Sequence, residues 1–147
     1  MGLDMHLTKS RYLTDKERAS LKIEFPIEPG WSVPKLSRVK EIVEEVAYWR
    51  KANAIHAWFV RNVQEGRDDC GIYYVSAEHL KSLLLVVVTV LDNPDRASEL
   101  LPTMDGFYFG SLMYDEDYFE SLEYTREILQ ALVDEESWDT LYYHTSW

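Results

Sequence analysis

Two long amphipathic segments constrain the fold of this chain more than any other feature of its sequence. Between residues 76 and 91, apolar residues recur at helical spacing behind Ser76, a residue type that commonly caps helix N-termini. Between residues 115 and 133 the same spacing follows Asp115, with further acids in the first turn, where the helix dipole favours negative charge. Each segment has one apolar face, so each helix needs a second layer to pack against.

Short segments with strand patterns supply that second layer. Apolar and polar residues alternate strictly from Leu3 to Leu7, which is the period of a half-buried strand. Four more strands are expected from alternation or from aromatic content: 21–25, 72–75, 107–109 after the Asp105-Gly106 turn, and 141–147. The sequence therefore predicts an α+β fold in which helices pack on one face of a small, mainly antiparallel sheet, as a single domain over residues 1–147.

Two short helices are also expected. Thr14 is followed three residues later by Glu17, the spacing of a capping box. Asn93 and Pro94 provide a cap and a favoured first helical residue for a helix that ends before Pro102.

The segment from Val39 to Val63 has two interpretations in its first half. Val39, Ile42, Val43 and Val46 fall at i, i+3, i+4 and i+7, which predicts a helix. Their β-branched side chains also fit a strand that leads into a helix at about Trp49. We expect helix up to Tyr48, with the strand as the open alternative, and helix from Trp49 to Val63.

The negative charge of the chain is concentrated in one region. Residues 1–91 carry 13 Lys/Arg and 12 Asp/Glu, whereas residues 92–147 carry 2 Lys/Arg and 14 Asp/Glu. An acidic surface repels phosphate backbones, so direct nucleic-acid binding is not expected. The ordinary interpretation is a solvated acidic helix. The alternative is an acidic decoy that imitates nucleic acid and occupies a basic host protein through residues 92–139.

The sequence also carries a prediction of compartment. Its longest uncharged apolar run, Leu83–Leu91, is much shorter than the roughly 20 residues that a membrane helix needs. The N-terminal residues have no apolar signal-peptide core, and Cys70, as the single cysteine, excludes a disulfide within the chain. We expect a cytoplasmic protein with no membrane partner.

The segment from Tyr48 to Phe59 is the first candidate for a binding site. On a helix, Trp49, Asn53 and His56 would share one face. Burying an amide and an imidazole is costly without polar partners, so a pocket or a polar network is implied. The ordinary interpretation is a core helix. The functional one is a ligand-facing helix on which Arg50 and Lys51 add cations for an anionic planar ligand such as a nucleotide.

The stretch from Leu100 to Ser111 is the second candidate. Two glycines bracket three aromatic residues, which fits either a tight turn with core aromatics or a loop that closes over a ligand or partner. No established catalytic motif is present, and we assign neither catalytic residues nor a cofactor. The expected ligand-binding residues are Trp49, Arg50, Lys51, Asn53, His56, Gly106, Phe107 and Ser111.

A metal-dependent hydrolase is a further alternative. Asp4 and His6 point to the same face of the first strand, and Asp68, Asp69 or His79 could supply a third ligand. Spacing alone does not bring those segments together, so no metal site is assigned.

Three segments carry a resemblance to a known family. They are Gly2–Leu7 (GLDMHL), residues 48–59 (YWRKANAIHAWF) and the stretch from Leu101 to Ser111. They resemble a family of small uncharacterised proteins of bacteriophages and prophages, in which tyrosine is expected at the position of His6. The resemblance implies a phage accessory protein acting in the host cytoplasm, and it implies no catalytic residues.

The leading hypothesis is a binding protein, rather than an enzyme, that captures a small anionic ligand or inhibits a host protein.

Overall fold

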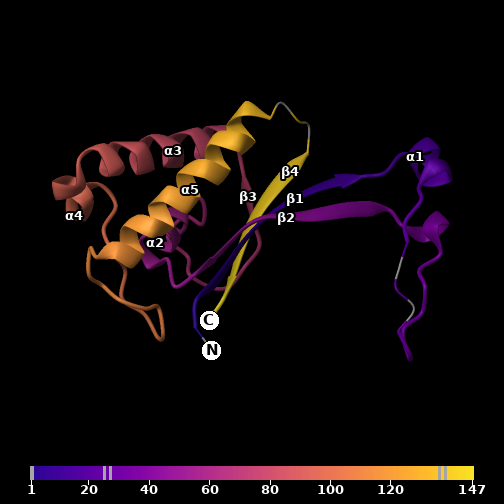
Figure 1. The fold of residues 1–147 in the computed structure, drawn as a ribbon, viewed down its shortest axis with the longest axis horizontal. Helices are drawn as coiled ribbons and strands as arrows, with labels where there is room; N and C mark the ends of the chain where they lie inside the picture. Colours follow the sequence, from indigo (N-terminus) through magenta and orange to yellow (C-terminus); the bar gives the residue numbers. More distant parts are fainter. Residues whose placement is uncertain (1, 25, 27, 136, 138) are drawn as a thin grey trace.

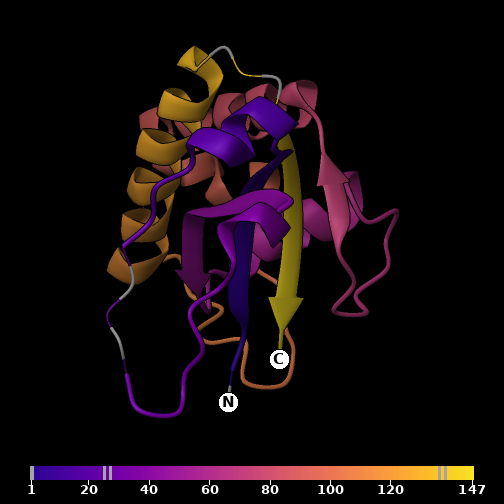
Figure 2. The ribbon, with the colours of Figure 1, turned by 90° about the vertical axis from the view of Figure 1, so that its right-hand side faces the viewer.

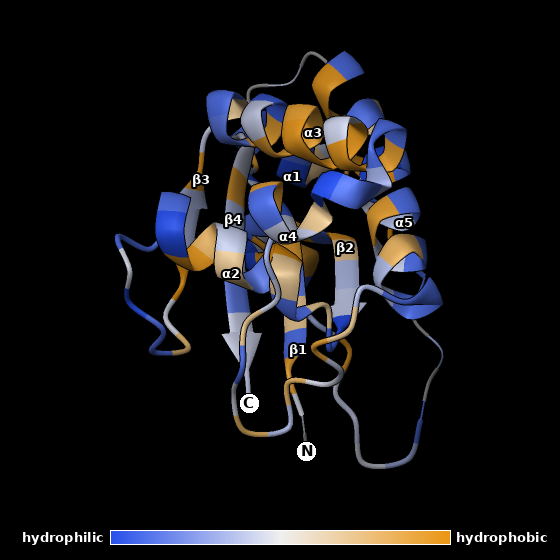
Figure 3. Ribbon diagram, turned by 90° about the vertical axis from the view of Figure 1, so that its left-hand side faces the viewer, coloured by the Kyte–Doolittle hydropathy of each residue, from blue (hydrophilic) through white to orange (hydrophobic). Residues whose placement is uncertain are grey.

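The strands of this protein form one four-stranded antiparallel sheet. The computed structural model describes residues 2–24, 26, 28–135, 137 and 139–147. Within them the strand order is β2-β1-β4-β3, and helices α2 to α5 lie together on one face of the sheet (Figures 1 and 3). The expected α+β fold with its antiparallel sheet is therefore confirmed.

The strands are β1 (Asp4–Tyr12), β2 (Glu41–Arg50), β3 (Tyr73–Val75) and β4 (Thr140–Ser146). The helices are α1 (Asp15–Ser20), η1 (Leu36–Arg38), α2 (Asn53–Asn62), α3 (Ala77–Asp92), η2 (Pro94–Arg96), α4 (Ala97–Leu100) and α5 (Glu116–Asp134).

Strand β1 is central because it pairs with β2 on one side and with β4 on the other. The alternation seen in the sequence gives it a core face: Leu3, Met5 and Leu7 have no exposed surface. Shifting this strand by one residue would turn those side chains to the opposite face, so burial fixes the register.

Helix α2 is the most buried helix. All eight residues from Asn53 to Val60 are buried, so this helix is covered on every side. Phe59 lies flat on Tyr143 of β4, with ring centroids 3.9 Å apart and an interplanar angle of 7°. This stacked pair joins the helical layer to the sheet.

The two amphipathic helices form as predicted. Ser76 accepts a hydrogen bond from the His79 amide at the start of α3, and Asp115 accepts one from the Tyr118 amide at the start of α5. Their apolar stripes face the core and pack α3 against α5. The short helices after Thr14 and Asn93 are also confirmed. None of the described helices has the length and apolar composition needed to cross a membrane.

The segment 41–50 is a strand, so the expected helix over 39–48 is wrong and the alternative holds. A register shift between β1 and β2 leaves Val46 as an extra residue, because Leu7 pairs with Ala47 and Thr8 with Glu45. Such a β-bulge interrupts the period-two alternation. Val39, Ile42, Val43 and Val46 lie before the bulge or at it, and none of them is buried, so their helix-like spacing does not mark a face that packs against the core.

Two smaller expectations also fail. Residues 107–109 form a turn, closed by the Phe109 amide bonding to the Gly106 carbonyl at 3.2 Å, where a strand was predicted. Tyr108 has φ +60°, which is incompatible with an extended chain. Residues 21–24 have no regular structure, and Phe25, the end of that expected strand, lies outside the described residues.

The chain between β1 and β2 projects away from the helices. This projection starts at the last two residues of β1 and covers residues 11–24, 26 and 28–40. It contains α1 and η1, which pack on each other and have no buried residues of their own. We call it the arm. Figures 1 and 2 show that it leaves the sheet on the face opposite to α2–α5. Of the residues of β2, only Ala47 and Trp49 are buried. Both lie between the bulge and α2. Residues 41–45, between the bulge and the arm, include no buried residue.

Substitutions on α3 test this division between core and surface. Leu83 is fully buried and Leu85 is 68 % exposed on the same helix. We expect Leu83→Ala to lower the free energy of unfolding by about 2–5 kcal/mol, because it leaves a cavity. Leu85→Ala should change it by less than about 0.5 kcal/mol. Urea denaturation measures both, and equal losses would show that α3 is oriented differently.

Candidate functional site

A pocket of about 280 Å³ lies where β2 turns into α2. One wall is the turn itself, residues 50–54, and a second wall is the loop around Gly110 and Ser111. The beginning of α5, with Asp115 and Asp117, forms the third wall. We call it the Lys51 pocket, after the residue whose backbone makes the turn.

Lys51 makes this sharp turn in a left-handed conformation, with φ +58°. Its amide donates to the Leu3 carbonyl at 2.8 Å, and its carbonyl accepts from the Asn53 amide at 2.9 Å. Two glycines with positive φ lie against its side chain. A Cβ on Gly110 would stand 2.9 Å from Cβ of Lys51, and a Cβ on Gly2 would stand 3.2 Å from its Cε. The aliphatic part of Lys51 is thus held between two glycines that any larger residue would crowd.

Asn53 positions the second wall of the pocket. Its buried amide nitrogen donates to the carbonyls of Phe109 (3.1 Å) and Ser111 (2.8 Å). Its amide oxygen accepts from the Met104 amide at 3.1 Å. Both amide protons are therefore used within the protein. The side chain lines the pocket, and its main role in this geometry is to hold the loop 103–111 against α2.

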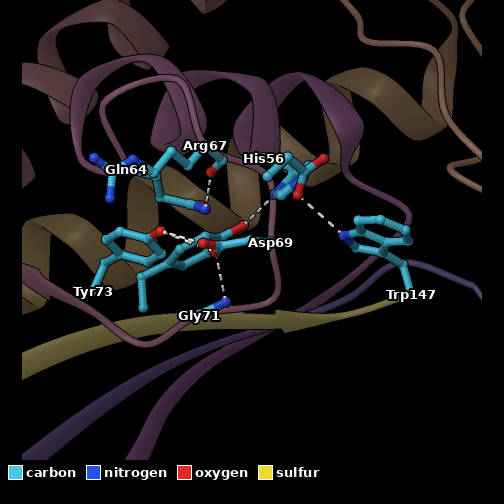
Figure 4. Close-up of polar contacts among 9 residues, drawn as sticks. His56, Gln64, Arg67, Asp69, Gly71, Tyr73 and Trp147 are labelled. Carbon is cyan, nitrogen blue, oxygen red and sulfur yellow. Dashed lines mark hydrogen bonds and ion pairs between the residues drawn. The ribbon is translucent and has the colours of Figure 1, made fainter.

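His56 lies in a different network, on the side of α2 that faces β4. Its Nε2 is 3.0 Å from Asp68 Oδ1 and its Nδ1 is 2.8 Å from the Tyr143 hydroxyl. A carboxylate can only accept, so Nε2 carries the proton and Nδ1 accepts from Tyr143. Asp68 also accepts from Trp147 Nε1 at 3.1 Å, and Figure 4 shows Trp147 on the side of His56.

The loop after α2 presents Asp68 to this network and is itself held by polar contacts. Gln64 donates to the Arg67 carbonyl at 2.6 Å. Asp69 accepts from the Tyr73 hydroxyl at 2.9 Å and from the Gly71 amide at 2.9 Å (Figure 4).

Burial determines the protonation of this network. It lowers the pKa of His56, although the nearby Asp68 carboxylate acts in the opposite direction. Burial also raises the pKa of Tyr143 well above its ordinary value. A neutral imidazole and a neutral phenol match the proton arrangement above. This network therefore joins α2 to the C-terminal strand, and the Tyr143 hydroxyl is a poor nucleophile.

The structure brings together half of the residues predicted for the site. Arg50, Lys51, Asn53 and Ser111 line the Lys51 pocket. Trp49 is not on the expected helix face: it ends β2, is buried, and donates from Nε1 to Thr125 Oγ1 at 2.8 Å. The other three residues, His56, Gly106 and Phe107, are not part of the pocket lining.

The sequence interpretation missed the contribution of α5. Asp115 was recognised as a cap, and it also accepts from the Ser111 hydroxyl at 3.3 Å, which ties the loop to the helix start. Asp117, in the same first turn, faces the pocket. The sequence signal was present in the acidic first turn, but nothing in it placed that turn beside Arg50 and Lys51.

The residues proposed as metal ligands are distributed over separate contacts. Asp4 bonds to the Tyr48 hydroxyl, and His6 Nδ1 lies 2.7 Å from Glu45. The His6 ring stacks on His144 with centroids 4.8 Å apart. His79 closes the cap of α3, and Asp68 and Asp69 belong to the networks above. Over the described ranges, no three His, Cys, Asp or Glu side chains are grouped so that they could hold a metal ion.

Comparison with models of known protein families, with curated protein sequences and with solved structures finds no match to this chain. The membership of a phage protein family rests on the quoted motifs and stays a prediction.

Substitution of Asn53 tests its positioning role. Asn53→Ala leaves the carbonyls of Phe109 and Ser111 without their donor, so we expect a loss of about 1–3 kcal/mol in unfolding free energy. Amide hydrogen exchange in residues 103–111 should also become faster, because the loop opens locally. Asn62→Ala, which removes one bond to the Trp58 carbonyl at the end of α2, is the matched control. Unchanged exchange in the loop would contradict the assignment.

The pH dependence of stability has a definite sign. Burial is the largest cause that lowers the pKa of both His56 and His144 below the ordinary 6.5. Below 6.5 the unfolded chain therefore binds more protons than the folded chain, and stability falls as the pH falls. The lowered pKa values of Glu17 and Asp69 act in the same direction, but only near and below their ordinary values of 4.5 and 3.8.

We expect the unfolding free energy to decrease between pH 7 and pH 5, and His144→Gln to make that decrease smaller. Urea titrations across this range measure the slope. A stability that rises on acidification would contradict the neutral state of the buried His56 and the partly buried His144.

Proposed function

We propose that this protein binds a small ligand that carries an anionic group, such as a mononucleotide, in the Lys51 pocket. The observation that carries the proposal is the backbone of Lys51. Lys51 directly follows Arg50 in the sequence and has a left-handed backbone conformation. In space its side chain lies against Gly2 and Gly110, and both cationic residues line the pocket.

Strain at Lys51 supports a functional interpretation. A residue other than glycine in the left-handed region costs on the order of 1–3 kcal/mol, and such residues cluster at ligand sites. Asn or Gly would fill this position at lower cost. The lysine supplies what those residues lack, a cation on a long stem. Within the part of the chain that the structure describes, neither Arg50 nor Lys51 forms an ion pair, so both charges are available to a ligand.

The pocket also limits the ligand by charge and by size. Asp117 lines the same pocket as the two cations, which favours a ligand that carries hydrogen-bond donors as well as an anionic group. The start of α5 adds the positive end of its dipole, offset by its acids. A volume of about 280 Å³ lies at the lower end of ordinary ligand sites, which are about 300–1,000 Å³. A pocket of this size favours a small ligand, such as a mononucleotide, over a dinucleotide.

Inhibition of a host protein is the second candidate. The loop beside the pocket exposes apolar side chains, with Phe107 71 % and Met113 68 % exposed. Aromatic residues and Met are enriched in protein interfaces, and here they adjoin the cations of the pocket. The acidic decoy also stays a prediction: apart from residues 136 and 138, which lie outside the described residues, its region includes the exposed acids of α5.

Charge removal at Lys51 tests the ligand site. Lys51→Asn keeps a residue type that tolerates positive φ and deletes the cation, so the turn should remain intact. We expect each of Lys51→Asn and Arg50→Gln to weaken binding of a mononucleotide by about tenfold or more. Isothermal titration calorimetry measures the affinity, after thermal-shift screening against mononucleotides and inorganic phosphate.

The control is Lys81→Asn on α3, which removes the same charge from an exposed residue outside the pocket lining. It should leave binding unchanged. The proposal fails if no anion in the screen shifts the melting temperature, or if all three variants bind equally well.

A further inference from the structure

The arm combines exposed apolar side chains with a surplus of positive charge. Trp31 is 81 % exposed, Val33 57 % and Tyr12 76 %. Residues 11–40 contain seven Lys/Arg and four Asp/Glu, a net charge of +3 in a chain whose total is −11. A monomer leaves this surface, including a tryptophan, in water.

Most of the cations of the arm are available for a partner. Arg11 pairs with Glu17, at 2.7 Å, and Arg18 pairs with Asp15. Lys16, Lys22 and the basic group before β2 form no ion pair with any described residue of the same chain. That basic group is Lys35, Arg38 and Lys40.

Helix α5 offers a surface of opposite charge. Glu116, Glu120, Glu123 and Glu127 follow one another at i, i+4, i+7 and i+11, so they form one stripe, and all four are exposed. We call it the acidic stripe. Only Glu123 has a cationic partner among the described residues, Arg126. Tyr124, 39 % exposed beside the stripe, adds an aromatic contact.

We propose that two copies of this chain form a two-fold dimer in which the arm of each copy lies on the acidic stripe of the other. The arm of one copy cannot lie on the acidic stripe of the same copy in this structure. The arm leaves the sheet on the face without helices, whereas α5 lies on the other face (Figures 1 and 2). A two-fold dimer requires each copy to carry both halves of the contact. This chain carries a basic apolar surface and an acidic surface, which meets that requirement.

The charges also disfavour a simpler dimer. Strand β2 is a long edge strand, and edge strands tend to pair with one another. Antiparallel pairing of two β2 strands through residues 41–45 would bring Glu41, Glu44 and Glu45 of both copies together. Like charges in register destabilise such pairing. Contact through the arm avoids this repulsion.

Reciprocal charge reversal tests the dimer. The arm variant carries Lys35→Glu, Arg38→Glu and Lys40→Glu, and the stripe variant carries Glu120→Lys, Glu123→Lys and Glu127→Lys. Each variant alone would place like charges against each other at both contacts. An equimolar mixture restores opposite charges at both contacts. We therefore expect the wild-type chain to be dimeric, each variant to be monomeric, and the mixture to form a one-to-one heterodimer.

Sedimentation equilibrium measures these states at about 0.05 M and about 0.5 M salt, where screening should weaken the wild-type dimer. Trp31→Ser should weaken it by about tenfold or more. The control, with Glu65→Lys, Glu78→Lys and Glu99→Lys, has the same change of net charge on exposed positions outside the stripe and should remain dimeric. Circular dichroism confirms that each variant is folded.

Three results would overturn the proposal. The first is a wild-type chain that stays monomeric at low salt. The second is a mixture of arm and stripe variants that does not associate. The third is a dimer that the control disrupts as strongly as the stripe variant does. None of these measurements involves the Lys51 pocket, so the dimer and the proposed ligand can fail independently.

Discussion

The burial of α2 on every side imposes a requirement that organises much of the molecule. A polar side chain on such a helix has no access to water, and leaving it without a hydrogen-bond partner would cost more than most single contacts contribute. Asn53 and His56 are the two polar residues in its buried run. Asn53 forms hydrogen bonds to the loop 103–111, and His56 forms hydrogen bonds to Asp68 and Tyr143. Two distant segments of chain are thereby fixed around one helix.

The Lys51 pocket follows from the same requirement. The hydrogen bonds of Asn53 hold the loop against the start of α2. In this position Gly110 is so close to Lys51 that residue 110 has no room for a side chain. The strand must then become a helix within a very short turn, and the left-handed Lys51 is the result. The arm is independent of this arrangement, since it joins the other ends of β1 and β2. The protein therefore presents two surfaces, a small charged pocket and a projecting basic arm, at separate places on one sheet.

Local chemistry made the amphipathic helices predictable. Caps at Ser76 and Asp115 and the stripes behind them depend on neighbouring residues, which a sequence displays directly. Two of the failures involve partners that are distant in sequence. The pairing of residues 41–50 with β1, which makes this segment a strand, is not visible in the residues of the segment itself. Trp49 was assigned to a helix face because nothing nearby indicated its bond to Thr125. For the site, the 48–59 segment and the Gly110 region were identified, but their polar residues divide between a pocket and an internal network.

The bulge at Val46 has an evolutionary consequence. It separates β2 into a part in which Ala47 and Trp49 face the core and a part, residues 41–45, that has no buried residue and leads to the arm. Insertion or deletion of matched residue pairs beyond the bulge would lengthen or shorten the arm without changing which side chains face the helices. The length of the arm and the packing of the core can therefore change independently in evolution. Related proteins with the same core could bind different partners through their arms.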